Sequence, residues 1–219
     1  MTEFFIPAGP GESEFVEKRS SFLGHVRCVE TEEEAKEFIA QVKKEHYDAR
    51  HNCWCYGIKD GPVRYSDDGE PQGTAGQPML NVFQREGVVN VVCVVTRYFG
   101  GILLGAGGLV RAYTQSAKDA LDAAGISVVR RWIEVLLPCS YAQYERVKLE
   151  TEGFGGVIAE ADYGADIALT VLLPEERADA FLAHILDVTA GTVEGLVCGE
   201  RFQDVPWRPP VWKEGGPHG

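Results

Sequence analysis

The stretch NVVCVVTRYFGGILLGAGGLVRA, residues 90–112, decides the fold of this chain. Its first seven residues, Asn90 to Thr96, form a nearly unbroken β-branched run, which predicts a strand buried on both faces. Arg97 and Tyr98 follow at the point where this strand leaves the core. Glycines come next, and the last of them open a helix that we predict from Leu109 to Ala124.

A second glycine-rich loop precedes the strand and reads RYSDDGEPQGTAGQP, residues 64–78. Because the two loops flank one strand, we expect them to form a single surface site. Bare amides at a helix N-terminus favour an anion, and Arg97 and Arg111 would add positive charge beside them. The predicted ligand-binding or partner-binding residues are Arg50, His51, Arg64, Ser66, Asp67, Asp68, Glu70, Thr74, Arg97, Tyr98, Gly100, Gly101, Gly105, Gly107, Gly108 and Arg111.

The acidic residues of the first loop allow two interpretations. Asp67, Asp68 and Glu70 could hold Mg²⁺ or exchange protons with a substrate. They could equally form a turn, in which Asp side chains bond local amides and Gly69 supplies a positive φ. We prefer the turn, because no further carboxylate or His cluster lies nearby in sequence. The acids could also pair with Arg97 or Arg111, which would make them structural.

Catalytic patterns are weak in this chain. Cys53 and His51 share a strand face, but nothing in the sequence lowers the pKa of the thiol. The GAGG segment before the predicted helix lacks a following Gly-Lys-Ser or Gly-Lys-Thr, which excludes a P-loop. Phosphoryl transfer stays open as a minor alternative, without an evident Lys or Mg²⁺ ligand. We therefore predict no catalytic residue, no metal and no cofactor.

Cations alternate with aromatic residues near the two loops, in a mixture that suits two kinds of partner. Single-stranded RNA stacks its bases on aromatic rings, and protein interfaces are rich in Tyr and Arg. We expect Phe99 to lie in the core. The residues of this mixture are Arg64, Tyr65, Arg97, Tyr98, Phe99 and Arg111.

Composition limits the partners further. The 219 residues carry a formal charge of −12, and an acidic chain is not a general phosphate-backbone binder. Residues 1–130 hold 14 Lys or Arg against 18 Asp or Glu, whereas residues 131–219 hold 7 against 15. Contact with RNA would therefore need a local patch in the first half. No apolar run could span a bilayer and no signal sequence is evident, so we expect a cytoplasmic protein without a membrane partner.

The first half reads as a loose arm, residues 1–14, and then alternating strands and helices. We predict one strand over 14–29 that bends at Gly24, and a helix that opens with the capping box Thr31-Glu-Glu-Glu34. A strand follows over CWCYGI, a second strand begins at Val63, and Thr74 is expected to cap a helix from Ala75 to Arg85. We expect Gly125 to end the helix that begins near Leu109.

The second half predicts the element order βαββαβ. The strands are expected over 128–138, 157–163, 166–173 and 192–202, with one helix after the Ser140-x-x-Gln143 capping box and another after Pro174. This order favours a ferredoxin-like sandwich. We therefore divide the chain into an arm (1–14), a first domain (15–127), a second domain (128–204) and a proline-rich, extended tail (205–219).

The strings SDDGEP, GTAG, TRYFGGI and LGAGGLVRAY resemble the IMPACT/YigZ family, in its bacterial two-domain form. The similarity runs from about Phe15 to Ala124, roughly half of the chain. It departs at Gln77, where relatives often carry Lys or Arg, and at Gln72, where a small residue is usual. The resemblance implies an α+β chain. Its first domain would be like domain 2 of ribosomal protein S5, and its second would be ferredoxin-like, similar to domain V of elongation factor G.

The resemblance also implies a role in translation, because eukaryotic relatives regulate initiation during amino-acid starvation. They do so with extra regions that this sequence lacks. Our first hypothesis is a non-enzymatic binding and regulatory protein, which uses the two-loop face on RNA, the ribosome or a translation factor. The second is an enzyme that acts on a phosphorylated or nucleotide ligand at the glycine-rich helix start. The third is a protein-interaction module that contacts its partner through the acidic second domain.

Overall fold

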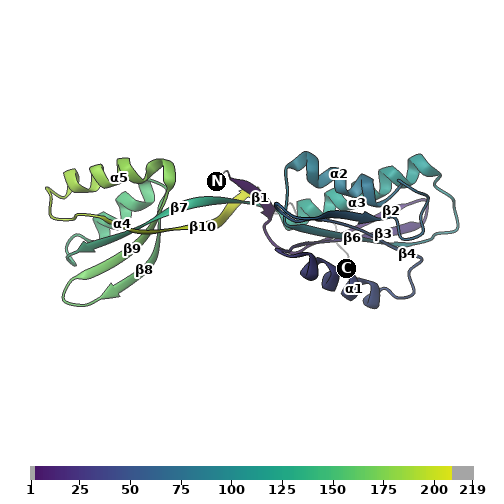
Figure 1. Ribbon diagram of the computed structural model, residues 1–219, viewed down its shortest axis with the longest axis horizontal. Coiled ribbons are helices and arrows are strands. Elements are labelled where there is room, and N and C mark those ends of the chain that lie inside the picture. The colour runs from purple at the N-terminus through teal and green to yellow at the C-terminus, as the bar shows by residue number, and fades with distance from the viewer. Residues whose placement is uncertain (1–2, 209–219) are drawn as a thin grey trace, which may run out of the picture. The chain divides into compact units, whose positions relative to one another are not determined.

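A computed structural model describes residues 3–208. The described chain divides into two compact domains, residues 4–128 and residues 129–204; residue 3 belongs with the second domain and residues 205–208 with the first. Both are mixed α and β (Figure 1). No helix within 3–208 is long and apolar enough to cross a membrane.

The first domain contains a five-stranded sheet in the order β2-β3-β6-β4-β5. Each neighbouring pair is antiparallel, and the central strand is β6. The bounds of its strands are β2 Gly11–Glu17, β3 Ser20–Cys28, β4 His51–Gly57, β5 Val63–Ser66 and β6 Val91–Tyr98, with the separate β1 at Phe4–Pro7.

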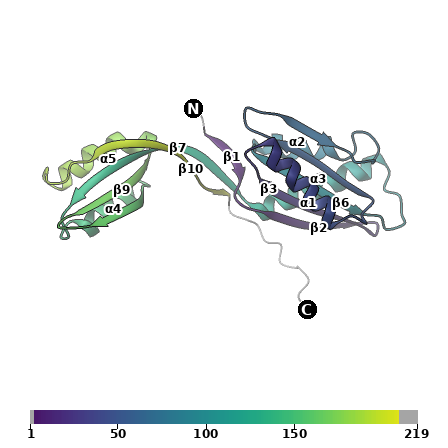
Figure 2. The same ribbon diagram turned by 60° about the horizontal axis from the view of Figure 1, so that its bottom comes forward.

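Helices cover both faces of this sheet. Two of them, α2 (Gly76–Glu86) and α3 (Ala106–Ala124), lie together on one face, and α1 (Glu32–Glu45) crosses the other (Figures 1 and 2). The larger core cluster lies under α2 and α3 and includes Met79, Phe83 and Tyr113; the smaller one lies under α1 and includes Ile39 and Val94. Two covered faces explain why a nearly continuous apolar run occupies the middle of the sheet.

Two predictions from local sequence are confirmed in this domain. Every residue of β6 from Val91 to Arg97 is buried, as expected for a strand covered on both faces. Thr31 caps α1: its hydroxyl accepts from the Glu34 amide at 3.2 Å, and the Glu34 carboxylate accepts from the Glu30 amide at 2.8 Å. The first bond is that of the predicted capping box, whereas the second differs from it, because Glu34 reaches the amide of Glu30, one residue before the N-cap Thr31.

The prediction of a loose arm followed by one bent strand is wrong. Residues 4–7 and 11–17 form strands, and β2 turns into β3 through a tight hairpin at Lys18 and Arg19, whose φ angles are 47° and 66°. Two central residues with positive φ are typical of a type I′ turn, which normally carries Asn or Gly. The sequence therefore offered no turn signal here.

Gly24 lies inside β3 rather than at a bend. A Cβ at this position would stand 2.7 Å from the carbonyl oxygen of Ser116 in α3 and 2.5 Å from the Ser13 hydroxyl. Glycine at position 24 therefore permits the close approach of α3 to the sheet.

Two helices of the first domain begin elsewhere than predicted. Ala75 is the N-cap of α2, and the buried Thr74 hydroxyl donates to the Pro71 carbonyl instead of capping the helix. Helix α3 begins at Ala106, with Gly105 as its N-cap, and not at Leu109. It ends at Ala124 before Gly125, as predicted.

The second domain has the predicted order βαββαβ. Strand β7 pairs with β9, which pairs with β8; β10 and β1 both pair with β7. Helices α4 and α5 pack on one face, where Val147, Phe181 and Ile185 join buried residues of β7 and β9 (Figure 1). The bounds are β7 Ile126–Cys139, α4 Tyr144–Gly153, β8 Val157–Tyr163, β9 Ile167–Pro174, α5 Glu175–Val188 and β10 Leu196–Arg208.

The ends of this domain differ from the prediction in two details. The Gln143 side chain accepts from the Ser140 amide and hydroxyl, so the predicted pair exists, but the helix starts only at Tyr144. The closing strand continues to Arg208, so the first four residues of the expected extended tail belong to a strand. The rest of that tail, residues 209–219, lies outside the described residues.

Candidate functional site

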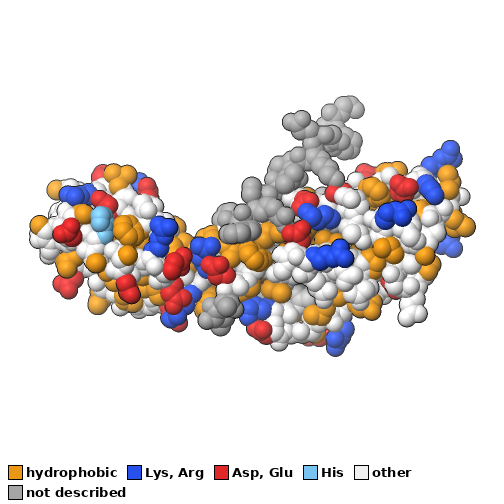
Figure 3. All heavy atoms as spheres, turned by 90° about the horizontal axis from the view of Figure 1, so that it is seen from above, with side chains coloured by type: hydrophobic (Ala, Val, Ile, Leu, Met, Phe, Trp, Pro, Cys, Tyr) orange, Lys and Arg blue, Asp and Glu red, His pale blue; other side chains and the backbone are white. Residues whose placement is uncertain are grey.

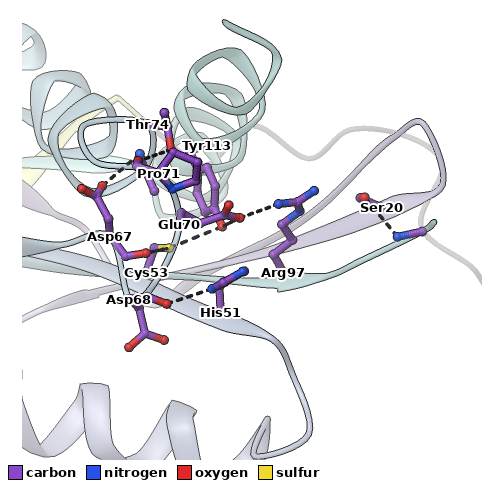
Figure 4. Close-up of polar contacts among 12 residues, drawn as sticks. Ser20, His51, Cys53, Asp67, Asp68, Glu70, Pro71, Thr74, Arg97 and Tyr113 are labelled. Atoms are coloured by element: carbon purple, nitrogen blue, oxygen red, sulfur yellow. Dashed lines mark hydrogen bonds and ion pairs between the residues drawn. The ribbon is translucent and has the colours of Figure 1, made fainter. Parts of the chain in front are cut away.

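The first carboxylate of the SDDGEP loop caps a helix. Asp67 accepts hydrogen bonds from the amides of Gly73 (2.8 Å), Ala75 (3.1 Å) and Gly76 (2.9 Å), at the start of α2 (Figure 4). A carboxylate that satisfies several free amides at a helix N-terminus is favoured by hydrogen bonding and by the helix dipole. Asp67 is therefore tied to the fold.

The second carboxylate joins three elements. Asp68 accepts from Lys43 of α1 at 2.7 Å and from the Asn52 amide of β4 at 2.8 Å. Its backbone oxygen lies 2.8 Å from Nδ1 of His51, and its amide donates to the Ser66 hydroxyl. His51 and Ser66 thus hold the loop in place.

The third carboxylate, that of Glu70, is buried and forms an ion pair with the buried Arg97. Arg97 Nη1 lies 2.6 Å from Glu70 Oε1, and the two side chains are only 7% and 3% exposed. The Tyr113 hydroxyl of α3 donates to the same oxygen at 2.9 Å (Figure 4). The prediction that Arg97 offers free positive charge at the surface is therefore wrong. Its charge is neutralised by Glu70, 27 positions earlier in the chain.

This arrangement decides between the two interpretations of the acidic loop. Each of the three side chains accepts donors from the protein itself, and together they join the loop to α1, α2, α3, β4 and β6. The turn interpretation and the predicted pairing of an acid with Arg97 are both confirmed. Gly69, with φ 88°, supplies the expected left-handed residue.

The surroundings of Cys53 do not activate its thiol as a nucleophile. Its thiol donates to the Asp67 carbonyl at 2.9 Å, and its sulfur lies 3.4 Å from the Tyr113 hydroxyl. Burial raises the pKa of the Cys53 thiol, and the nearby acids raise it further. Since the thiolate is the reactive form, this environment opposes covalent catalysis by Cys53.

The second loop begins where β6 reaches the surface, and it rests on the β2–β3 hairpin. The Gly100 amide donates to the Ser20 hydroxyl at 3.1 Å (Figure 4). A Cβ on Gly100 would stand 2.0 Å from both the carbonyl carbon and the oxygen of Arg19. Only glycine permits this contact, which fixes the loop against the hairpin turn.

Apolar side chains project from this loop into solvent. Phe99 is 41% exposed, Ile102 43% and Leu103 81%. The prediction that Phe99 belongs to the core is wrong, because β6 ends before it. The guanidinium carbons of Arg97 and Arg50 lie 5.6 Å and 6.0 Å from the centre of its ring, within the range of cation–π attraction.

The start of α3 is also open to solvent. Gly101, Gly105 and Gly107 are exposed, whereas Gly108 is buried near Leu104. Arg111 is exposed, and a Cβ on Gly107 would lie 3.7 Å from its Nη1. A cation therefore stands beside the first turn of the helix, as predicted.

The remaining predicted residues lie apart from this loop. Arg64 is exposed on the edge strand β5 and pairs in register with Tyr56, near the end of β4 opposite to His51. Tyr98 points to the α1 face of the sheet, where it bonds His46 and Asp48. The sixteen predicted residues therefore do not form one patch.

Lys18 and Arg19 are residues that the sequence analysis missed. Their hairpin turn touches Gly100, and both side chains are exposed. Within the described part of the chain, Lys18, Arg19 and Arg50 make no ion pair. We call the surface formed by Lys18, Arg19, Arg50, Phe99, Ile102 and Leu103 the β6-end surface. Figure 3 shows basic and hydrophobic side chains intermixed on the first domain.

Comparison with known proteins gives two matches to family models. Residues 18–121 match the Impact N-terminal domain, and residues 137–192 match a domain of unknown function, DUF1949. The first match includes both glycine-rich loops, and the second lies within the βαββαβ domain.

Curated relatives match along most of the chain. IMPACT family member YvyE of Bacillus subtilis is 37% identical over 87% of this chain and 89% of its own length. IMPACT family member YigZ of Escherichia coli is 37% identical over 91% of this chain and all of its own length. Protein IMPACT of Mus musculus is 35% identical over 48% of this chain and 34% of its own length.

A solved structure also resembles the chain. It is titled a crystal structure of a hypothetical protein and is 36% identical, with a TM-score of 0.57. The similarity covers 91% of this chain and 98% of the solved one.

Proposed function

The chain belongs to the IMPACT family, and from that premise we propose that it binds RNA, free or in the ribosome, through the β6-end surface. The proposed role is a non-catalytic one in translation. The observation that carries the proposal is the exposed Phe99 ring, with the exposed Arg50 beside it and the Lys18–Arg19 turn against the same loop; within residues 3–208 these three cations make no ion pair.

The negative net charge of the chain favours contact through a local basic surface. The whole chain carries a formal charge of −12, so its overall field repels a phosphate backbone. Many basic residues elsewhere in the first domain are paired with acids, as Lys43 is with Asp68 and Lys118 with Asp122. Lys18, Arg19 and Arg50 keep their charge available for phosphates, and Arg111 stands at the neighbouring helix start.

The groups that could act in catalysis have other partners, which favours binding over chemistry. Protein donors form hydrogen bonds with the carboxylates of Glu70, Asp67 and Asp68. Burial raises the pKa of the Cys53 thiol. A surface of cations and aromatic or apolar side chains can hold a nucleic acid without any of these groups.

Co-sedimentation with ribosomes across a salt series tests the proposal. The full chain is compared with a triple variant, Lys18→Ala with Arg19→Ala and Arg50→Ala, and with the matched control Arg64→Ala, which removes an exposed cation from the β5 edge. Binding should weaken as salt rises, and the triple variant should bind about tenfold more weakly at low salt. The control should bind like the unmodified chain.

Unchanged binding by a folded triple variant would reject the proposal. Arg97 is unsuitable for this test, because removing a buried cation leaves Glu70 unpaired and disturbs the fold. Circular dichroism and a thermal scan of each variant separate loss of binding from loss of structure.

A further inference from the structure

We infer that the β6-end surface takes an unpaired RNA strand and not a duplex. The inference rests on the proposed function and adds the form of RNA that the surface recognises. It is drawn from the exposed apolar side chains of the loop, because binding of phosphates requires cations but does not require such side chains.

The first observation is the exposure of three apolar side chains within the five positions 99–103. Phe99, Ile102 and Leu103 are 41%, 43% and 81% exposed, directly after a strand that is buried from Val91 to Arg97. A regular duplex presents phosphates and sugars outward and hides the base faces, so apolar side chains gain little from it. An unpaired strand offers base faces that can stack on such side chains.

The second observation is that the Phe99 ring lies beside a cation, Arg97, that is already held in place. Glu70 fixes the Arg97 guanidinium at 2.6 Å, and Arg97 lies 5.6 Å from the Phe99 ring centre. Arg50, which is exposed, lies 6.0 Å from the same centre. Guanidinium planes stack on unpaired bases as aromatic rings do. A platform that is ordered before binding loses less conformational entropy when the ligand arrives.

The third observation places phosphate contacts beside the platform. Gly100 touches the backbone of Arg19 and bonds the Ser20 hydroxyl, so the loop and the hairpin turn form one unit. Lys18 and Arg19 are held in left-handed conformations that non-glycine residues rarely adopt. The turn that carries the two cations therefore lies against the loop that carries the apolar residues, an arrangement that suits the phosphates and bases of a single strand.

Fluorescence anisotropy with the full chain tests this inference. The probes are a labelled 12-nucleotide RNA of mixed sequence without self-complementarity and the blunt duplex that it forms with its complement. Three proteins are compared with the unmodified chain: Ile102→Ser with Leu103→Ser; Lys18→Ala with Arg19→Ala; and the control Leu149→Ser with Leu196→Ser. The control removes two leucines of the second domain that are 65% and 64% exposed.

The single strand should bind about tenfold tighter than the duplex, since stacking is available only to the former. Ile102→Ser with Leu103→Ser should weaken single-strand binding about five- to tenfold without changing its salt dependence. Lys18→Ala with Arg19→Ala should weaken both forms and reduce the slope of log affinity against log salt by about 1.4 for the single strand. The control should match the unmodified chain.

Equal or tighter binding of the duplex would overturn this inference and leave the proposed function standing. The inference also fails if the serine double variant binds the single strand normally but loses ribosome co-sedimentation, because the loop would then contact a ribosomal protein. Absence of salt-dependent binding to either RNA form and to ribosomes would reject the proposed function itself.

Discussion

The two glycine-rich loops differ in the direction in which they present their side chains. In the first, Asp67, Asp68 and Glu70 turn inward and bind α2, α1 and β6. In the second, Phe99 and Leu103 turn outward to solvent. The contrast teaches that a loop rich in charged residues can be structural, while a loop of glycines and apolar residues forms the exposed surface.

Removing Glu70, the buried acid of the first loop, should cause the largest loss of stability. Glu70→Gln leaves Arg97 charged and without its partner in the interior, so the free energy of unfolding should fall by about 3–5 kcal/mol. Urea denaturation measures the change. Glu37→Gln on the exposed side of α1 is the matched control and should unfold like the unmodified chain. A loss below about 1 kcal/mol for Glu70→Gln would show that the pair does not hold the loop.

Removing the helix-capping acid should have a smaller effect. Asp67→Ala leaves three amides at the start of α2 without their acceptor, and we expect a loss of about 2 kcal/mol in the free energy of unfolding. Asp60→Asn, at an exposed turn, serves as the control because asparagine tolerates its positive φ. Equal stability of the Asp67 and Asp60 variants would contradict the capping role.

Acid should weaken the first domain through a residue that belongs to neither loop. Burial lowers the pKa of His25 below 6.5, and His46 lowers it further, whereas Glu12 and Glu45 oppose the shift. A histidine whose pKa is lower in the folded state binds fewer protons there than in the unfolded state, so stability should fall as pH drops below about 6.5. His25→Asn should lose less stability between pH 7 and pH 5.5 in urea titrations. An identical loss in both proteins would refute the role of His25.

The second loop should show the smallest effect on stability. Leu103 is 81% exposed, so Leu103→Ser should change the free energy of unfolding by less than about 0.5 kcal/mol. The same variant should bind RNA more weakly, in contrast to Asp67→Ala, which should act on stability first. A substantial destabilisation by Leu103→Ser would remove the distinction between the two loops.

Local patterns in the sequence predicted much of the fold. The β-branched run gave the buried β6, and the Thr31 capping box gave the start of α1. Both signals act over a few neighbouring residues. The element order of the second domain followed from the same kind of pattern.

The site was harder to predict, because its contacts join distant residues. Glu70 neutralises Arg97 across 27 positions, and Asp67 caps a helix that starts nine positions later. The Lys18–Arg19 turn lacks the Asn or Gly that normally marks such a hairpin, so the sequence did not predict a turn that presents these two cations. A strand pattern also cannot show where burial stops, which is why Phe99 was assigned to the core.

The contact between Gly100 and Arg19 has an evolutionary consequence. The two segments fit because one atom is missing at position 100, where a methyl group would overlap the Arg19 carbonyl. A mutation there can be accommodated only if the hairpin is rebuilt at the same time, by a changed length or a different turn. Along this lineage, the glycine and the shape of the hairpin should therefore be inherited or lost as a pair.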